Sequence, residues 1–187
     1  ISDLEVDQRE VNSKLYHIRY PIENSKDFIT IATTRPETML GDTAIAVNPK
    51  DDRYKSLVNK FVIIPLVERK IKVIEDEYAD PEQGTGAVKI TPAHDFNDYE
   101  VGQRNNLEIL NIFTSDGKIN ENAPKEFIGL DRFEARKRLL KKLKEKDFLV
   151  KEENIKNKIP YGDRSNSIIE PFLTEQWFAD AKKLSVK

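Results

Sequence analysis

Short apolar runs separated by polar turns are the feature that most limits what this 187-residue chain can fold into. The runs are rich in β-branched and aromatic side chains, which favour the extended conformation. In residues 14–22 apolar side chains recur at every second position, which is the pattern of a half-buried strand. The other strand candidates lie at residues 28–33, 43–47, 61–64, 71–74, 87–90, 108–113, 148–151 and 155–159.

Few segments have the pattern of a helix. A long helix is expected over residues 131–147, where Asp131 is a candidate N-cap and leucines form an apolar stripe. Shorter helical stretches are expected over residues 51–58 and 95–105. So many strands beside so few helices argue against a doubly wound parallel sheet. We therefore predict an α+β, β-rich fold in which a β-barrel core is flanked by helices.

Composition excludes several kinds of site. The chain has no cysteine, which excludes disulfides, thiolate catalysis and cysteine-based zinc sites. It has only two histidines, His17 and His94, so a three-histidine zinc site is excluded and any Ser-His-Asp triad must use one of the two. We assign His17, on the more polar face of its strand, a structural role. The prediction is that no metal and no cofactor is bound.

Charge and hydropathy limit the partners. Lys and Arg number 31 against 33 Asp and Glu, so contact with a nucleic acid must use a local patch. The basic helix expected over residues 131–147 is either a solvated face or such a patch. No apolar run approaches the roughly 20 residues that span a bilayer, so we expect no membrane partner and a cytoplasmic location. Because the chain does not begin with Met, we expect an internal fragment of a longer protein.

The first segment that combines polar side chains with a tight turn is TTRPETMLGDT, which directly follows the strand expected at residues 28–33. Pro36 suits the first turn of a helix, where its missing N–H costs nothing. The exposed N–H groups of such a turn can hold an oxyanion or a phosphate. The alternative is a capped strand-to-helix turn without a ligand. The polar side chains that converge there are Thr33, Thr34, Arg35 and Thr38.

The second such segment is GTGAVKITPAHDFNDYE, at residues 84–100. It is not a dinucleotide-binding loop, because Lys89 stands where the third glycine is needed. Lys89 and Thr91 alternate onto one face of a strand, while Asp95 and Asp98 share one face of the helix that follows. The alternative is an ordinary helix start, with Asp95 as the cap and Asp98 solvated. His94 lies between the two groups, and this density of polar residues favours a site.

Together, ATTRPETMLGDTAIAVNP (residues 32–49) and GTGAVKITPAHDFNDYE resemble the editing (CP1) domain of valyl-tRNA synthetases, which are class I aminoacyl-tRNA synthetases. PFLTEQWF (residues 171–178) is similar to the linker by which that family's chain returns to its synthetic domain. The resemblance covers essentially the whole chain. It implies that residues 1–159 are an editing domain with a barrel fold and that residues 160–187 are the return linker. The chain lacks His-x-Gly-His and Lys-Met-Ser-Lys-Ser, so ligase activity and ATP binding are expected of a full-length synthetase only.

The resemblance implies an aminoacyl-tRNA ester hydrolase, which removes threonine from mischarged tRNA(Val) by a positioned water and spares valyl-tRNA(Val). Its partners would be that tRNA and the rest of the synthetase chain. Two alternatives stay open: a non-catalytic module that binds the tRNA 3′ end, and an isoleucyl-type specificity that clears valine. The implied catalytic residues are Thr33, Thr34, His94 and Asp98. The implied substrate-binding residues are Arg35, Thr38, Lys89, Thr91, Asp95 and Asp98.

The chemistry of discrimination explains why such a site is polar. Valine and threonine are nearly isosteric, so an apolar pocket separates them poorly. A second site whose polar groups pair with the threonine hydroxyl leaves those groups unpaired when valine enters, at a cost of about 1–3 kcal/mol. By resemblance Asp98 holds the α-ammonium, and Asp95 is the candidate for the hydroxyl. His94 is either a general base or a residue that orients its loop.

Overall fold

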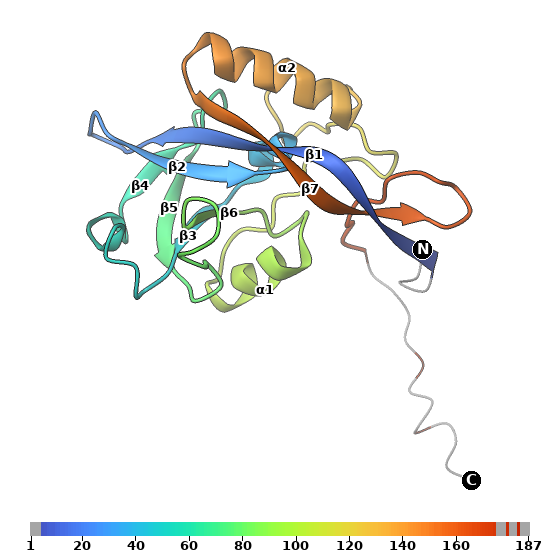
Figure 1. The fold of residues 1–187 in the computed structure, drawn as a ribbon, viewed down its shortest axis with the longest axis horizontal. Helices are drawn as coiled ribbons and strands as arrows, with labels where there is room; N and C mark the ends of the chain where they lie inside the picture. The colour runs from blue at the N-terminus through green and yellow to red at the C-terminus, as the bar shows by residue number, and fades with distance from the viewer. Residues whose placement is uncertain (1–4, 175–178, 180–182, 184–187) are drawn as a thin grey trace.

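A computed structural model of the chain describes residues 5–174, 179 and 183 (Figure 1). The strands are β1 (Val6–Pro21), β2 (Phe28–Thr33), β3 (Ala44–Val47), β4 (Phe61–Ile63), β5 (Lys70–Glu75), β6 (Ala87–Ile90) and β7 (Leu149–Gly162). The helices are the 3₁₀ helices η2 (Pro36–Gly41) and η3 (Lys55–Leu57) and the α-helices α1 (Phe96–Arg104) and α2 (Arg132–Glu145).

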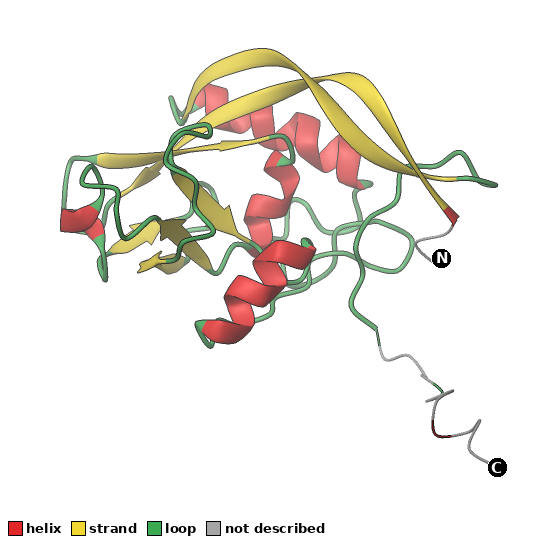
Figure 2. Ribbon diagram, turned by 60° about the horizontal axis from the view of Figure 1, so that its bottom comes forward, coloured by secondary structure: helices red, strands yellow, loops and turns green. Residues whose placement is uncertain are grey.

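The strands form two sheets. The first is antiparallel, in the order β2-β1-β7, and the second has the order β4-β5-β3-β6, with β3 and β5 parallel. Strands β1 and β7 pair from Val6↔Gly162 to Ile18↔Leu149 and form a long twisted ribbon that extends beyond the rest of the fold (Figure 1). Figure 2 shows α2 and α1 on opposite sides of the molecule, with η2 between them.

The predicted α+β class is confirmed, but the predicted β-barrel is wrong. A barrel needs an unbroken ladder around its circumference. Here, in the part of the chain that the structure describes, the strand pairing between the two sheets on one side is limited to the isolated bridge Ile22↔Val62. On the other side β2 and β6 are neighbours, but no ladder joins them among the described residues. The strand expected at residues 108–113 is also absent, since that segment contributes only the isolated bridge Phe113↔Ile119.

The core lies between the sheets and under α2. The predicted alternation in residues 14–22 is confirmed, because Ile18 and Tyr20 are fully buried on the face of β1 that meets the second sheet. Helix α2 matches its predicted position, and the Asp131 carboxylate caps it by accepting from the Phe133 N–H at 2.8 Å. Its buried face includes Leu139 and Leu143.

The end of the chain differs in detail from the expectation. The two strands expected at residues 148–151 and 155–159 are one continuous strand, β7, which runs past the expected domain boundary at residue 159. The division into editing domain and linker stays a prediction. Of the linker-like segment, residues 175–178 lie outside the described residues. No helix in the described part of the chain has the length and apolar character to cross a membrane.

Candidate functional site

The turn after β2 is built as the sequence predicts, with Pro36 opening a short helix. The hydroxyl oxygen of Thr33 accepts from the Arg35 N–H at 3.1 Å, and the Thr38 hydroxyl donates to the Arg35 carbonyl at 2.9 Å. Thr33 and Thr38 are buried, whereas Thr34 is half-buried. Two of the three predicted hydroxyls therefore shape the turn itself. Each keeps one further hydrogen-bonding function, the Thr33 proton and the Thr38 lone pairs.

A buried polar cluster lies at the end of η2, centred on the carboxylate of Asp42, the C-cap of that helix. Asp42 is fully buried and accepts from the Tyr20 hydroxyl at 2.7 Å and from the Thr91 hydroxyl at 2.6 Å. The Lys89 ammonium lies 3.1 Å from the same carboxylate and also donates to Thr91. Burial raises the pKa of Asp42, and Lys89, Thr91 and Tyr20 oppose that rise by favouring the charged form. The cluster thus fixes Lys89 and Thr91 in place.

Asp98 joins this cluster through the backbone. The Thr91 N–H donates to Asp98 Oδ2 at 2.8 Å, and the Asp98 side chain is almost fully buried. Burial raises the pKa of Asp98 to about 6, although the Lys89 ammonium and the Thr91 N–H act in the opposite direction. The alternative in which Asp98 is solvated is wrong, because the side chain is almost fully buried, and this burial outweighs the favourable helix dipole.

Asp95 is the N-cap of α1, as the simpler interpretation of the sequence expected. Its Oδ1 accepts from the N–H groups of Asn97 at 2.9 Å and of Asp98 at 3.2 Å. Sequence reasoning missed Tyr78, from the loop after β5, which lies beside both aspartates. Burial and the nearby Asp98 and Asp95 carboxylates raise the pKa of the Tyr78 hydroxyl to about 12. Tyr78 therefore stays a neutral hydroxyl at the edge of the site.

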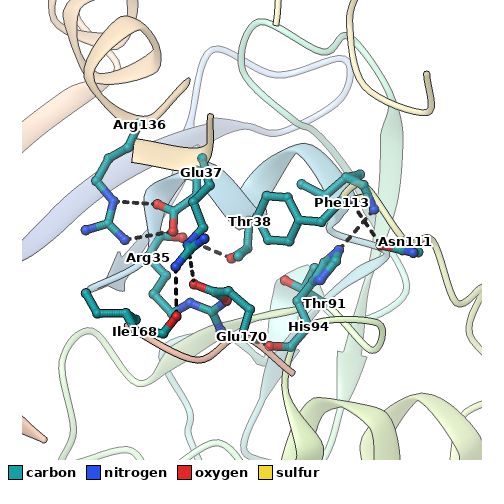
Figure 3. A network of polar contacts seen from close by, with 12 residues as sticks. Arg35, Glu37, Thr38, Thr91, His94, Asn111, Phe113, Arg136, Ile168 and Glu170 are labelled. Carbon is teal, nitrogen blue, oxygen red and sulfur yellow. Dashed lines mark hydrogen bonds and ion pairs between the residues drawn. The ribbon is translucent and has the colours of Figure 1, made fainter. Parts of the chain in front are cut away.

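His94 is held as a neutral imidazole. Its Nε2 accepts from the Ile112 N–H at 3.0 Å, and its ring packs against Phe113 with 4.6 Å between the ring centroids (Figure 3). Burial, together with the Arg35 and Lys89 cations, lowers the pKa of His94 to about 3. With Nε2 used as an acceptor, the proton of the neutral ring sits on Nδ1. Neither nitrogen is then available to take up a proton near neutral pH.

Arg35 connects the two predicted segments. Its guanidinium donates to the His94 carbonyl at 2.8 Å and forms an ion pair with Glu170 (Figure 3). The segments also meet at Asp42 and Thr91, so the structure brings together the turn at residues 33–38 and the strand-turn-helix at 89–98. The sequence did not point to Asp42 or Tyr20, because their role follows from the pairing of β3 with β6 and from the long-range contact of Tyr20, on β1, with Asp42.

Comparisons with known proteins show relatives of this chain in sequence and in fold. A family model described as "Leucyl-tRNA synthetase, editing domain" matches residues 56–132. The valine–tRNA ligase of Pelagibacter ubique is 84% identical over all 187 residues, and that of Thermotoga maritima is 52% identical over 99% of this chain. In both cases the chain spans about one fifth of the relative's length (21%).

Two solved structures share the fold at lower sequence identity. The structure titled GlLeuRS-CP1 matches with a TM-score of 0.56 and 14% identity, covering 74% of this chain and 99% of that one. The agnB2 LeuRS of Agrobacterium radiobacter, in a ternary complex with tRNA and LeuAMS, matches with a TM-score of 0.56 and 22% identity over 80% of this chain and 20% of that one. The fold is that of the CP1 editing domains of aminoacyl-tRNA synthetases. Within that class, the chain belongs to the valyl-tRNA synthetase family.

Proposed function

We propose that this domain hydrolyses the ester of threonine wrongly attached to tRNA(Val) and spares valyl-tRNA(Val). The observation that carries the proposal is the cluster of Lys89, Thr91 and Asp98, which hydrogen bonds link to one another and to Asp42 at the end of η2. The turn at residues 33–38 contacts the same segment through Arg35 and the His94 carbonyl. A substrate with a hydroxyl can pair with buried polar groups of this kind. A substrate with a methyl in its place leaves them unpaired, which costs about 1–3 kcal/mol.

We assign each polar group a role according to the hydrogen-bonding atoms that its contacts within the protein leave unused. Asp98, anchored through Oδ2, is assigned to the α-ammonium of the substrate, which would also stabilise its charged form. Asp95 uses Oδ1 for the helix cap, and we assign its Oδ2 to the threonine hydroxyl. Lys89 and Thr91 complete the polar wall. Arg35 is assigned to binding the substrate beside the turn.

The threonines are assigned to the reacting end of the substrate. The Thr33 hydroxyl accepts from the backbone, so its proton is available to an ester oxygen that gains negative charge. The Thr38 hydroxyl donates to the backbone, so its lone pairs are available to the attacking water or a ribose hydroxyl. Thr34 is assigned to the terminal adenosine. His94 orients the loop instead of acting as a base, and positioning a water against a labile ester supplies much of the rate.

The test is deacylation of purified threonyl-tRNA(Val) and valyl-tRNA(Val) by the full synthetase chain that carries this domain. We expect release of threonine and little release of valine, and a loss of about 100-fold or more in threonine release for Asp98→Ala, which removes the anchor of the ammonium. Tyr99→Phe, one residue along the same helix, is the matched control and should behave as wild type.

Other results would support the other interpretations. Preferred release of valine would indicate an isoleucyl-type specificity. Salt-dependent tRNA binding without hydrolysis, unchanged in Asp98→Ala, would indicate a binding module and contradict the proposal.

A further inference from the structure

We propose that Glu170 is a positioning residue of the editing site, which acts by orienting the guanidinium of Arg35. This inference rests on the proposed function. Glu170 lies beyond β7, in the segment that the sequence assigns to a return linker, 135 positions away from Arg35. Its carboxylate nevertheless forms an ion pair with Arg35 and lies 3.1 Å from the Arg132 Nε. Only 15% of its side chain is exposed.

The backbone after β7 is folded so as to deliver Glu170 to this place. The chain reverses after Gly162, whose N–H donates to the Ser167 carbonyl at 3.0 Å. Ile168 then bridges back to Tyr161, and the Ile169 N–H donates to the Pro160 carbonyl at 2.9 Å. The Arg132 guanidinium holds the Ile168 carbonyl at 2.9 Å. Glu170 therefore follows an ordered reversal that is fixed to both β7 and α2.

The charges around Arg35 explain why a carboxylate at position 170 stabilises the position of its guanidinium. Three guanidinium groups gather beside the turn, those of Arg35, Arg132 and Arg136. Two other carboxylates lie near Arg35, those of Asp95 and Glu37. Asp95 caps α1, while Glu37 is fully buried and engaged by Arg136 in a bidentate pair with two contacts of 2.7 Å (Figure 3). Glu170 thus supplies the negative charge that offsets the repulsion between Arg35 and Arg132.

The two contacts of Arg35 also fix the plane of its side chain. One terminal nitrogen donates to the His94 carbonyl at 2.8 Å and the other pairs with Glu170 (Figure 3). A planar guanidinium held at two points has one orientation, and its remaining N–H groups point in fixed directions. Without Glu170, a single contact to the His94 carbonyl leaves the group free to rotate. The position of the segment after β7 therefore determines how Arg35 meets the substrate.

The experiment uses the full synthetase chain and two readouts. The first is the kinetics of threonyl-tRNA(Val) hydrolysis, and the second is binding of a non-hydrolysable adenosine carrying threonine through a 3′-amide. Glu170→Gln keeps the shape and removes the charge, so we expect KM and the dissociation constant of the analogue each to rise about tenfold, with kcat within about twofold of wild type. Glu170→Asp should recover part of the affinity. Glu126→Gln, which breaks an exposed ion pair with Lys142, is the matched control and should change neither readout.

A double variant separates positioning from a general structural role. If Glu170 acts through Arg35, then Arg35→Gln/Glu170→Gln should bind the analogue no more weakly than Arg35→Gln alone. Additive losses, or wild-type KM and affinity in Glu170→Gln, would overturn the inference. A wild-type chain that binds the analogue but hydrolyses nothing would refute the proposed function alone, and the effect of Glu170→Gln on binding would still decide this inference. A wild-type chain that does neither would refute both.

Discussion

Two lysine–carboxylate pairs in this domain have the same chemistry and opposite surroundings. On the β1/β7 ribbon, Lys14 lies 2.7 Å from Glu152, and both side chains are exposed to solvent, at 50% and 36%. In the candidate site, Lys89 lies 3.1 Å from Asp42, at 9% and 0% exposure. Water screens the first pair, so it contributes little to stability. The second pair has lost its hydration and is tolerated only because Tyr20 and Thr91 also bond to Asp42.

The comparison shows that the fold pays a desolvation penalty at the candidate site, where the charges of Lys89 and Asp42 are buried. Replacing a buried ion pair by apolar side chains is often neutral or stabilising, so burial of Lys89 and Asp42 is not explained by stability. Under the proposed function, the pair is explained by a site that needs a lysine in one fixed position. The ribbon pair, by contrast, stays hydrated at the surface of the β1/β7 ladder.

Removing the buried cation should have the largest effect on stability. Lys89→Met leaves the Asp42 carboxylate buried without its cation, so we expect the free energy of unfolding of the chain to fall by about 3–5 kcal/mol. Urea denaturation followed by circular dichroism measures this change. The double variant Asp42→Asn/Lys89→Met contains no buried charge and should regain part of the loss. Equal stability of the single variant and wild type would show that the carboxylate does not depend on Lys89.

The buried carboxylate of Asp98 should impose a pH dependence on editing. Its pKa is raised to about 6, so the group is neutral at pH 5 and charged above pH 7. Only the charged form pairs with the substrate ammonium, so we expect kcat/KM for threonyl-tRNA(Val) hydrolysis to fall about tenfold from pH 7 to pH 5, after subtraction of spontaneous ester hydrolysis. His94, with its pKa lowered to about 3, does not titrate in this range. A profile that is flat between pH 5 and pH 7 would contradict this role of Asp98.

The same pKa predicts the pH dependence of stability, and its sign is opposite to that of a salt-bridged carboxylate. The folded chain holds the Asp98 proton more tightly than the unfolded chain, whose aspartates titrate near 3.9. The contribution of this group is therefore largest below pH 4 and is lost as the pH rises to about 6. Asp98→Asn should lack this loss. Denaturation of both chains at pH 4 and pH 7 measures the difference, and parallel curves would contradict the raised pKa.

Local patterns predicted those parts of the fold that depend on neighbouring residues. The alternation along β1, the extent of α2 and the cap at Asp95 all follow from sequence spacing. The closed barrel and the strand at residues 108–113 were wrong because they depend on long-range partners. There the Ile112 N–H is taken by the His94 ring, and the Asn120 amide group holds the Asn111 carbonyl at 3.0 Å. Side chains thus satisfy backbone groups that a strand would have offered to a neighbour.

The candidate site was predictable to the same degree. Both polar segments were recognised, and the structure brings them together, because each is a continuous stretch with its own turn chemistry. Asp42 and Tyr20 were missed, since nothing in their local sequence shows that Ala44 pairs with Ile90 and so places Asp42 beside Thr91. Glu170 was missed for the same reason, at a sequence separation of 135 residues from Arg35.

The smallest effect is expected on the ribbon and completes the comparison. Lys14→Met removes the cation that pairs with Glu152, but water hydrates the carboxylate that remains, so no buried charge is created. We expect this variant to have the same urea midpoint as wild type, both at low salt and at high salt. Lys89→Met, in contrast, should shift the midpoint relative to wild type under both conditions. If the shift for Lys14→Met is as large as that for Lys89→Met, burial does not determine how much each of these ion pairs contributes to the free energy of unfolding.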